Sequence, residues 1–213
     1  MHFICADMWS IVMEYSMSME QINLLWINKN MRKTLKIYNL YDMNKKYLKR
    51  LTNRILRQEI YKDLILLNLE HSPGVTNIRH LLNLRVLNCG GVSSINQNGL
   101  LGLNKMETLI CSYNKNIVDV NYFSETLKIL DCSGNCGIDQ NGIQGLKCIE
   151  ILICNNNGKI KNLEHICNTL KILDCCNCLY GIGQHGISKL KLQVLKCSQN
   201  PHIKNVSHMA NTL

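Results

Sequence analysis

The 213-residue sequence is poor in proline, in large aromatic residues and in long apolar runs. It contains 2 Pro, 2 Trp and 2 Phe, and only 18% of its residues are charged. The scarcity of proline excludes collagen-like and proline-rich linker proteins. No run approaches the ~18 consecutive apolar residues of a membrane-spanning helix. The N-terminus also has no basic leader before an apolar stretch, so we expect neither a membrane span nor a secretory signal.

Cysteine and apolar residues are abundant instead. Apolar residues make up 46% of the chain, so we expect a folded protein rather than a disordered one. The 12 cysteines have no export signal beside them, which predicts reduced thiols in an intracellular protein of the cytoplasm or nucleus.

A nine-residue pattern recurs every 20–22 residues from Leu64 onward. The seven segments read LILLNLEHS, LRVLNCGGV, METLICSYN, LKILDCSGN, IEILICNNN, LKILDCCNC and LQVLKCSQN, beginning at Leu64, Leu84, Met106, Leu127, Ile149, Leu170 and Leu192. Position 1 is Leu, Met or Ile, position 4 is always Leu, and position 6 is Leu69 once and then Cys six times. Position 9 is Asn114, Asn135, Asn157 or Asn200 in four segments and Cys178 in another. The pattern resembles the leucine-rich repeat.

This resemblance implies an α/β solenoid, a curved coil with short parallel strands on its concave face. Because side chains alternate along a strand, positions 4 and 6 should point inward and positions 3 and 5 outward. The family's Asn at position 9 satisfies buried backbone groups of adjacent coils. The segments after the strands alternate between two types, such as IDQNGIQGL and NLEHICN, which indicates a two-coil unit of about 43 residues with turns and 3₁₀ pieces.

The cysteines at position 6 should form one inward column of stacked thiols. Adjacent strands are ~4.8 Å apart, which places neighbouring Cβ atoms farther apart than a disulfide prefers. A zinc site would need Cys175, Cys176 and Cys178 as ligands, but strand alternation points Cys175 inward and Cys176 outward. Cys176 is the outward-facing candidate for a reactive thiol. The recurring histidines, His80, His165 and His208, are interpreted as structural turn residues. We therefore expect no metal, no cofactor and no enzyme activity.

Residues 43–63 form a basic segment between the N-terminus and the repeats. Residues 1–62 carry 11 Lys/Arg against 5 Asp/Glu, and no acid interrupts 44–58. Apolar residues run through this stretch at helical spacing. One interpretation is a helix that binds nucleic acid or a membrane surface. We favour a linker or capping helix whose apolar stripe docks on the repeats. In this interpretation neither nucleic acid nor a membrane is a partner.

The N-terminal segment, residues 1–42, resembles an F-box, in which a hydrophobic residue precedes D-x-W-x-I, Glu-Tyr and LLxxNKxxR. The matching residues are Ile4, Asp7, Trp9, Ile11, Glu14, Tyr15, Leu24, Leu25, Asn28, Lys29 and Arg32, and Cys5 stands where the family has Pro. The resemblance implies a Skp1-like adaptor as partner, contacted by Ile4, Cys5, Asp7, Trp9, Ile11, Tyr15, Leu25, Asn28 and Lys29. The alternative is a helical cap that covers the first coil.

An F-box-like segment ahead of cysteine-bearing repeats resembles the F-box/leucine-rich-repeat proteins of giant DNA viruses, which act in the host cytoplasm. This resemblance implies a substrate receptor of a cullin–RING ubiquitin ligase, which acts by proximity. The alternative is a repeat scaffold with no link to ubiquitin. The outward positions predict the target surface: Ile110, Tyr113, Ile129, Asp131, Ile151, Ile153, Ile172, Asp174, Val194 and Lys196.

The repeats, residues 64–213, finish on Leu213, which matches position 1 of an eighth coil. Repeat arrays need a polar cap on each terminal coil. Either the reading frame is truncated, or a partner or a second copy of the chain covers this coil, and we expect self-association by aggregation or dimerisation.

Overall fold

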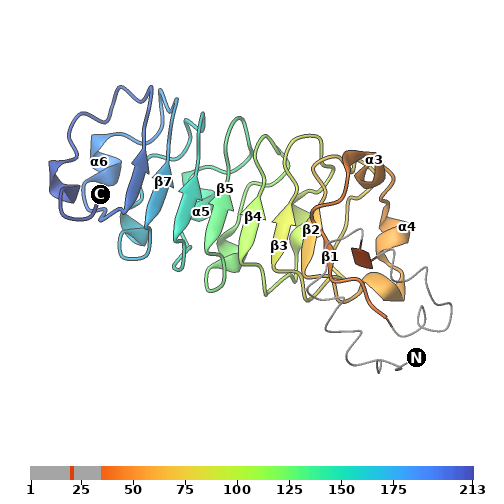
Figure 1. Ribbon diagram of the computed structural model, residues 1–213. Helices are drawn as coiled ribbons and strands as arrows, with labels where there is room; N and C mark the ends of the chain where they lie inside the picture. The colour runs from red at the N-terminus through yellow and green to blue at the C-terminus, as the bar shows by residue number, and fades with distance from the viewer. Residues whose placement is uncertain (1–19, 22–34) are drawn as a thin grey trace. The chain divides into compact units, whose positions relative to one another are not determined.

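The computed structural model describes residues 20–21 and 35–213 (Figure 1). The chain divides into two compact units. Unit 1 comprises Met1–Asn88 and Val92–Lys105, and unit 2 comprises Cys89–Gly91 and Met106–Leu213. Both are built from successive leucine-rich coils, each with a short strand and a turn-rich return, so the predicted leucine-rich-repeat solenoid fold is confirmed.

Unit 1 contains three parallel strands in chain order, β1 (Asn39–Leu40), β2 (Leu66–Asn68) and β3 (Val86–Asn88). Leu40, Leu67 and Leu87 lie side by side in register and are buried. Strand β1 belongs to a coil that the repeat pattern did not include, because Asp42 stands at position 6, where the other segments have Leu or Cys. A 3₁₀ turn, η3 (Gln97–Leu100), follows β3.

The basic segment of unit 1 forms short turns rather than one continuous helix. These turns are α3 (Lys45–Leu48), α4 (Asn53–Leu56) and η2 (Glu59–Tyr61). The Thr52 hydroxyl accepts a hydrogen bond from the Ile55 backbone N–H at 3.3 Å, so a new helix begins there. Leu48 and Leu56 are buried, while the basic side chains Lys45, Lys46, Lys49, Arg50, Arg54 and Arg57 are exposed. The predicted capping helix is therefore wrong as a single helix, because the chain breaks into turns, although apolar residues of the segment are buried and its basic side chains are exposed.

Unit 2 contains five parallel strands, also in chain order. They are β4 (Thr108–Ile110), β5 (Ile129–Asp131), β6 (Ile151–Ile153), β7 (Ile172–Asp174) and β8 (Val194–Lys196). Between and after them lie η4 (Asn121–Phe123), α5 (Gln140–Ile143), η5 (Glu164–Ile166), α6 (Gln184–Ile187) and η6 (Ser207–Met209). These one-turn helices agree with the expected return segments.

The core of unit 2 is the predicted column of leucines and thiols. Position 4 contributes the buried side chains Leu109, Leu130, Leu152 and Leu173. Position 6 contributes Cys89, Cys111, Cys132, Cys154 and Cys175, all fully buried, and Cys197, which is partly exposed. The cysteines of the described chain are free thiols. A small apolar thiol fits this position because it fills the space beneath a narrow coil without a polar group that needs a partner.

The alternation of coil types has a packing cause in unit 2. A Cβ on Gly142 would lie 2.1 Å from the Val118 carbonyl oxygen of the preceding coil, so only glycine allows this approach. His165 Nε2 in the next coil lies 2.9 Å from the Ile143 carbonyl oxygen. Gly186 and His208 repeat both contacts two coils later. The histidines are therefore structural turn residues, as predicted. Each coil of one type packs on a coil of the other type through these glycine and histidine contacts.

Candidate functional site

The outward face of the unit 2 strands carries two columns of side chains in register. Position 3 aligns Thr108, Ile129, Ile151, Ile172 and Val194. Position 5 aligns Ile110, Asp131, Ile153, Asp174 and Lys196. From Thr108 to Asp174 these side chains are half-buried, because each packs against its neighbours across strands ~4.8 Å apart. The structure thus brings nine of the ten predicted target-binding residues together on one surface, which we call the strand face.

Two carboxylates lie within the aliphatic columns of the strand face and differ in their partners. Asp131 Oδ1 accepts a hydrogen bond from the Ser133 backbone N–H at 3.0 Å. Asp174 Oδ2 lies 3.9 Å from Lys196 Nζ, and its Oδ1 is buried without a hydrogen-bond partner among the described residues. The strand face therefore combines aliphatic side chains with fixed negative charges.

Tyr113, the tenth predicted residue, lies just beyond the end of β4. Its side chain is 61% exposed. Its backbone is in the left-handed region, with φ of 60°, and its ring occupies the space above Gly134, where a Cβ would meet ring carbon Cε1 at 2.4 Å. All six unit 2 residues at position 8 share this conformation: Gly91, Tyr113, Gly134, Asn156, Asn177 and Gln199. The repeated Gly and Asn at position 8 were a signal that sequence reasoning missed.

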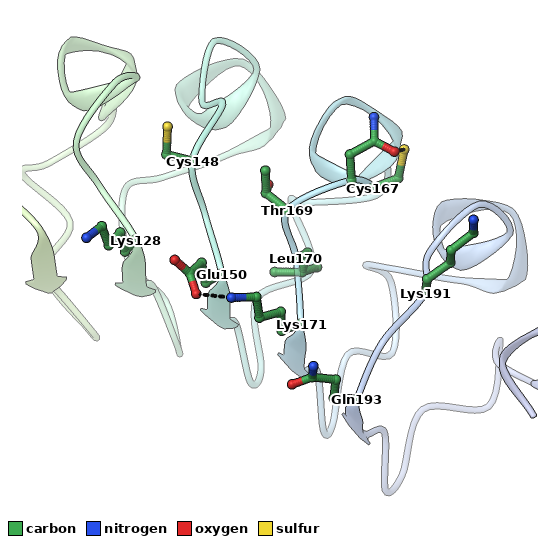
Figure 2. A pocket seen from close by; sticks show the side chains of 10 residues that line it. Lys128, Cys148, Glu150, Cys167, Thr169, Leu170, Lys171, Lys191 and Gln193 are labelled. Carbon is green, nitrogen blue, oxygen red and sulfur yellow. Dashed lines mark hydrogen bonds and ion pairs between the residues drawn. The ribbon is translucent and has the colours of Figure 1, made fainter. Parts of the chain in front are cut away.

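A groove of about 590 Å³ lies along the segments that lead into β5 to β8 (Figure 2). Its lining residues are Lys128, Cys148, Glu150, Cys167, Asn168, Thr169, Leu170, Lys171, Lys191 and Gln193. Lys171 Nζ donates to Glu150 Oε2 at 2.5 Å, and this hydrogen bond lowers the pKa of Glu150. The groove was not predicted, although Lys128, Glu150, Lys171 and Gln193 share position 2 of the repeat, which is charged or polar in every segment from Leu84 onward.

The turn at the end of each strand is held by buried polar side chains. Asn157 Nδ2 donates to the Cys132 carbonyl at 3.0 Å and to the Ile138 carbonyl at 3.2 Å, both in the preceding coil. Asn114 and Asn200 make equivalent bonds to the coils before them. These contacts agree with the role expected from the family for position 9.

Asn135 was predicted to make the same contacts, and this prediction is wrong. Its side chain is exposed, and the next residue, Cys136, is buried instead. The Cys136 thiol donates to the Cys132 carbonyl at 2.9 Å. The turn has the same length in both coils, since Ile138 follows Cys132 by six residues and Ile160 follows Cys154 by six. The buried position is therefore shifted by one residue within a turn of unchanged length.

The buried thiols are poor nucleophiles where their pKa is raised. Burial raises the pKa of Cys89, Cys111 and Cys175, the last to about 12. Burial also raises the pKa of Cys176, the outward candidate for a reactive thiol, which disfavours the thiolate. Hydrogen bonding with Cys154 lowers the pKa of Cys178.

No group of three or more His, Cys, Asp or Glu side chains within residues 20–21 and 35–213 could hold a metal ion. Likewise, no helix in these residues is long and apolar enough to cross a membrane. All nine predicted adaptor-binding residues, from Ile4 to Lys29, lie outside the described residues.

Comparisons with known proteins identify no family for this chain. No family model matches the chain. No curated protein matches it. Among solved structures, the chain is similar to an internalin from Listeria monocytogenes, with a TM-score of 0.41 and 17% sequence identity. The match covers 86% of this chain and 60% of the internalin chain. The leucine-rich-repeat fold is established by the coils of this chain itself.

Proposed function

We propose that this chain is a protein-binding module that takes its target on the strand face of unit 2. The observation that supports this is the register of the strands, which places Ile129, Ile151 and Ile172 side by side on an outward surface. Aliphatic side chains aligned at the centre of a surface, with polar groups around them, are typical of protein interfaces.

The finer proposal is that the module is a substrate receptor of a cullin–RING ubiquitin ligase. Its support is the F-box resemblance of residues 1–42, including Trp9, which implies binding to a Skp1-like adaptor. The chain itself would perform no chemistry, since holding a target near a ubiquitin-charged enzyme raises the effective concentration of the two reactants. The second candidate is a scaffold that uses the same strand face without an adaptor.

Affinity capture with two substitutions separates these functions. Wild-type protein should capture both a Skp1-like adaptor and a target from a lysate. Trp9→Ala should lose the adaptor and keep the target, whereas Ile151→Glu should lose the target and keep the adaptor. Trp26→Ala and Val118→Glu are the matched controls, since Trp26 occupies an unspecified position of the F-box pattern and Val118 is an exposed residue outside the strands.

The outcomes that contradict the proposal are distinct for each part. If folded wild-type protein captures targets but no adaptor, the chain is a scaffold. If Ile151→Glu, with an unchanged circular dichroism spectrum, captures the same targets as wild type, the strand face is not the binding surface. Substitutions are preferable to removing residues 1–42, because Leu40 is a buried part of β1 and its loss would damage the first coil.

A further inference from the structure

The lysine-lined groove borders the strand face along the ends where the strands begin. Backbone hydrogen bonds fix this border, since the Glu150 N–H donates to the Lys128 carbonyl at 2.8 Å and the Lys171 N–H donates to the Glu150 carbonyl at 2.9 Å. Each of these residues comes one position before a position 3 residue, so the groove and the isoleucine column follow each other along the same strands.

The charge of the groove is positive and is partly unneutralised. Three lysines and one glutamate line it, and the single carboxylate, Glu150, already pairs with Lys171. Lys128 and Lys191 are exposed, and neither forms an ion pair in the described residues, although Lys128 also helps to lower the pKa of Glu150 electrostatically. These two ammonium groups come from coils about three strand spacings apart, or roughly 14 Å at ~4.8 Å per strand.

We propose that this groove binds acidic side chains of the protein partner whose aliphatic residues pack on the strand face. The inference rests on the proposed function and deepens it by naming the chemistry of the partner: an aliphatic segment flanked by at least two carboxylates. Complementary charge at the rim of an interface fixes orientation and excludes partners of the wrong sign.

Nucleic acid fits the groove less well than an acidic protein segment. The lining contains no aromatic ring on which a base could stack and no arginine for bidentate phosphate contacts. The Glu150 carboxylate would also face a phosphate backbone at close range. An acidic peptide avoids this repulsion because its carboxylates are spaced, and it can place them at Lys128 and Lys191 on either side.

Selection of peptides on the full-length chain tests the proposal without a known partner. A phage library of random 12-residue peptides, selected on immobilised protein, should yield peptides with aliphatic residues and at least two Asp or Glu. The affinity of one selected peptide, measured by fluorescence anisotropy, should fall at least about tenfold in the double variant Lys128→Glu/Lys191→Glu. The matched double variant Lys161→Glu/Lys204→Glu changes the same net charge at exposed lysines outside the groove, and its affinity should stay within about twofold.

A charge swap makes the test specific for contact rather than stability. The same peptide with its acids replaced by Lys should bind Lys128→Glu/Lys191→Glu more tightly than it binds the wild-type chain. The proposal is overturned if selection yields no acidic peptides, if Lys128→Glu/Lys191→Glu leaves the affinity unchanged, or if a 20-nucleotide oligothymidine displaces the peptide with the same lysine dependence.

The Ile151→Glu variant separates failure of this inference from failure of the proposed function. Loss of peptide binding in Ile151→Glu, with no effect of Lys128→Glu/Lys191→Glu, contradicts the groove and leaves the strand face intact as the binding surface. Loss only in Lys128→Glu/Lys191→Glu supports the groove and contradicts the strand face.

Discussion

The two units solve the same packing problem with different side chains. In unit 1 the inward position 6 is Leu69, and the buried residue at the turn is Ser72, whose hydroxyl donates one hydrogen bond to the Leu48 carbonyl at 2.7 Å. In unit 2 the inward position is a thiol, and Asn157 at the turn reaches two carbonyls. One hydroxyl proton satisfies one acceptor, whereas the two amide protons of Asn satisfy two. The stability of unit 2 is therefore expected to depend more on its turn residues than that of unit 1 does. Because the core of unit 2 contains thiols, its stability should also depend on pH.

The outward faces of the units differ as well. Position 3 is aliphatic in both units, with Leu66 and Val86 in unit 1. Position 5 includes Ile110 and Ile153 in unit 2, whereas in unit 1 it is Asn68 and Asn88. The Oδ1 atom of the Asn68 side chain accepts a hydrogen bond from the Glu70 backbone N–H at 2.9 Å. Unit 1 has no aliphatic side chain at position 5, so regular coils do not by themselves make a docking surface. For this reason the interface is proposed on unit 2.

The largest expected effect is alkaline destabilisation of unit 2. Burial raises the pKa of Cys89, Cys111 and Cys175, and hydrogen bonds with neighbouring thiols, together with burial, raise the pKa of Cys132 and Cys154. The folded state thus holds these protons more tightly than the unfolded state. Stability is fully present below the ordinary thiol pKa and falls above it, by about 1.4 kcal/mol per thiol for each pH unit.

Urea denaturation followed by circular dichroism at intervals from pH 7.5 to pH 10 measures this loss. Cys136 and Cys178 oppose it because their pKa values are lowered, but they are two thiols against six, since the pKa of Cys176 is raised as well. Cys89→Val should make the pH dependence shallower. A free energy of unfolding that stays constant up to pH 10 would contradict the prediction, and so would an equal loss in unit 1, whose described residues contain no cysteine.

The next effect is the loss of a turn amide. Asn157→Ala removes both amide hydrogen bonds, but the Cys132 carbonyl keeps the Cys136 thiol as a donor. The main loss is therefore at the Ile138 carbonyl, and we expect about 2 kcal/mol of destabilisation. Ser72→Ala in unit 1 removes one bond and should cost about 1 kcal/mol. The measurement is urea unfolding at pH 7, with hydrogen exchange to locate the change. Equal losses for the two variants would remove the proposed difference between the units.

A smaller effect, on rates rather than on stability, should distinguish inward from outward thiols. Cys111 and Cys132 are fully buried, so they should react with iodoacetamide at least about 100-fold more slowly than Cys148 and Cys176, because reaction requires opening of the coil. Mass spectrometry of peptides after timed alkylation gives each rate. Uniform rates at all four sites would be incompatible with an inward thiol column.

The smallest effect tests the shifted turn. Asn135→Ala should change the free energy of unfolding by less than about 0.5 kcal/mol, because this side chain is exposed. The same urea titration serves for this variant and for Asn157→Ala. If Asn135→Ala cost as much as Asn157→Ala, the assignment of the buried role to Cys136 would be wrong.

Much of the fold could be predicted because burial repeats within each coil. The leucines at position 4 and the cysteines at position 6 were assigned inward from two-residue alternation alone, and they are the core of unit 2. The columns on the strand face follow from the same alternation, since equal coil positions meet in register. The coil of β1 was missed because its return is longer and its pattern lacks the cysteine.

The sequence by itself determined the coil length, the inward spine and the outward columns, because these depend on the alternation of side chains along one strand. Only the tertiary structure decided which polar side chain turns inward at each strand end, as with Cys136 in place of Asn135, and where the lysines gather into a groove. Those features depend on contacts between coils, where a shift of one residue in a turn exchanges a buried side chain for an exposed one.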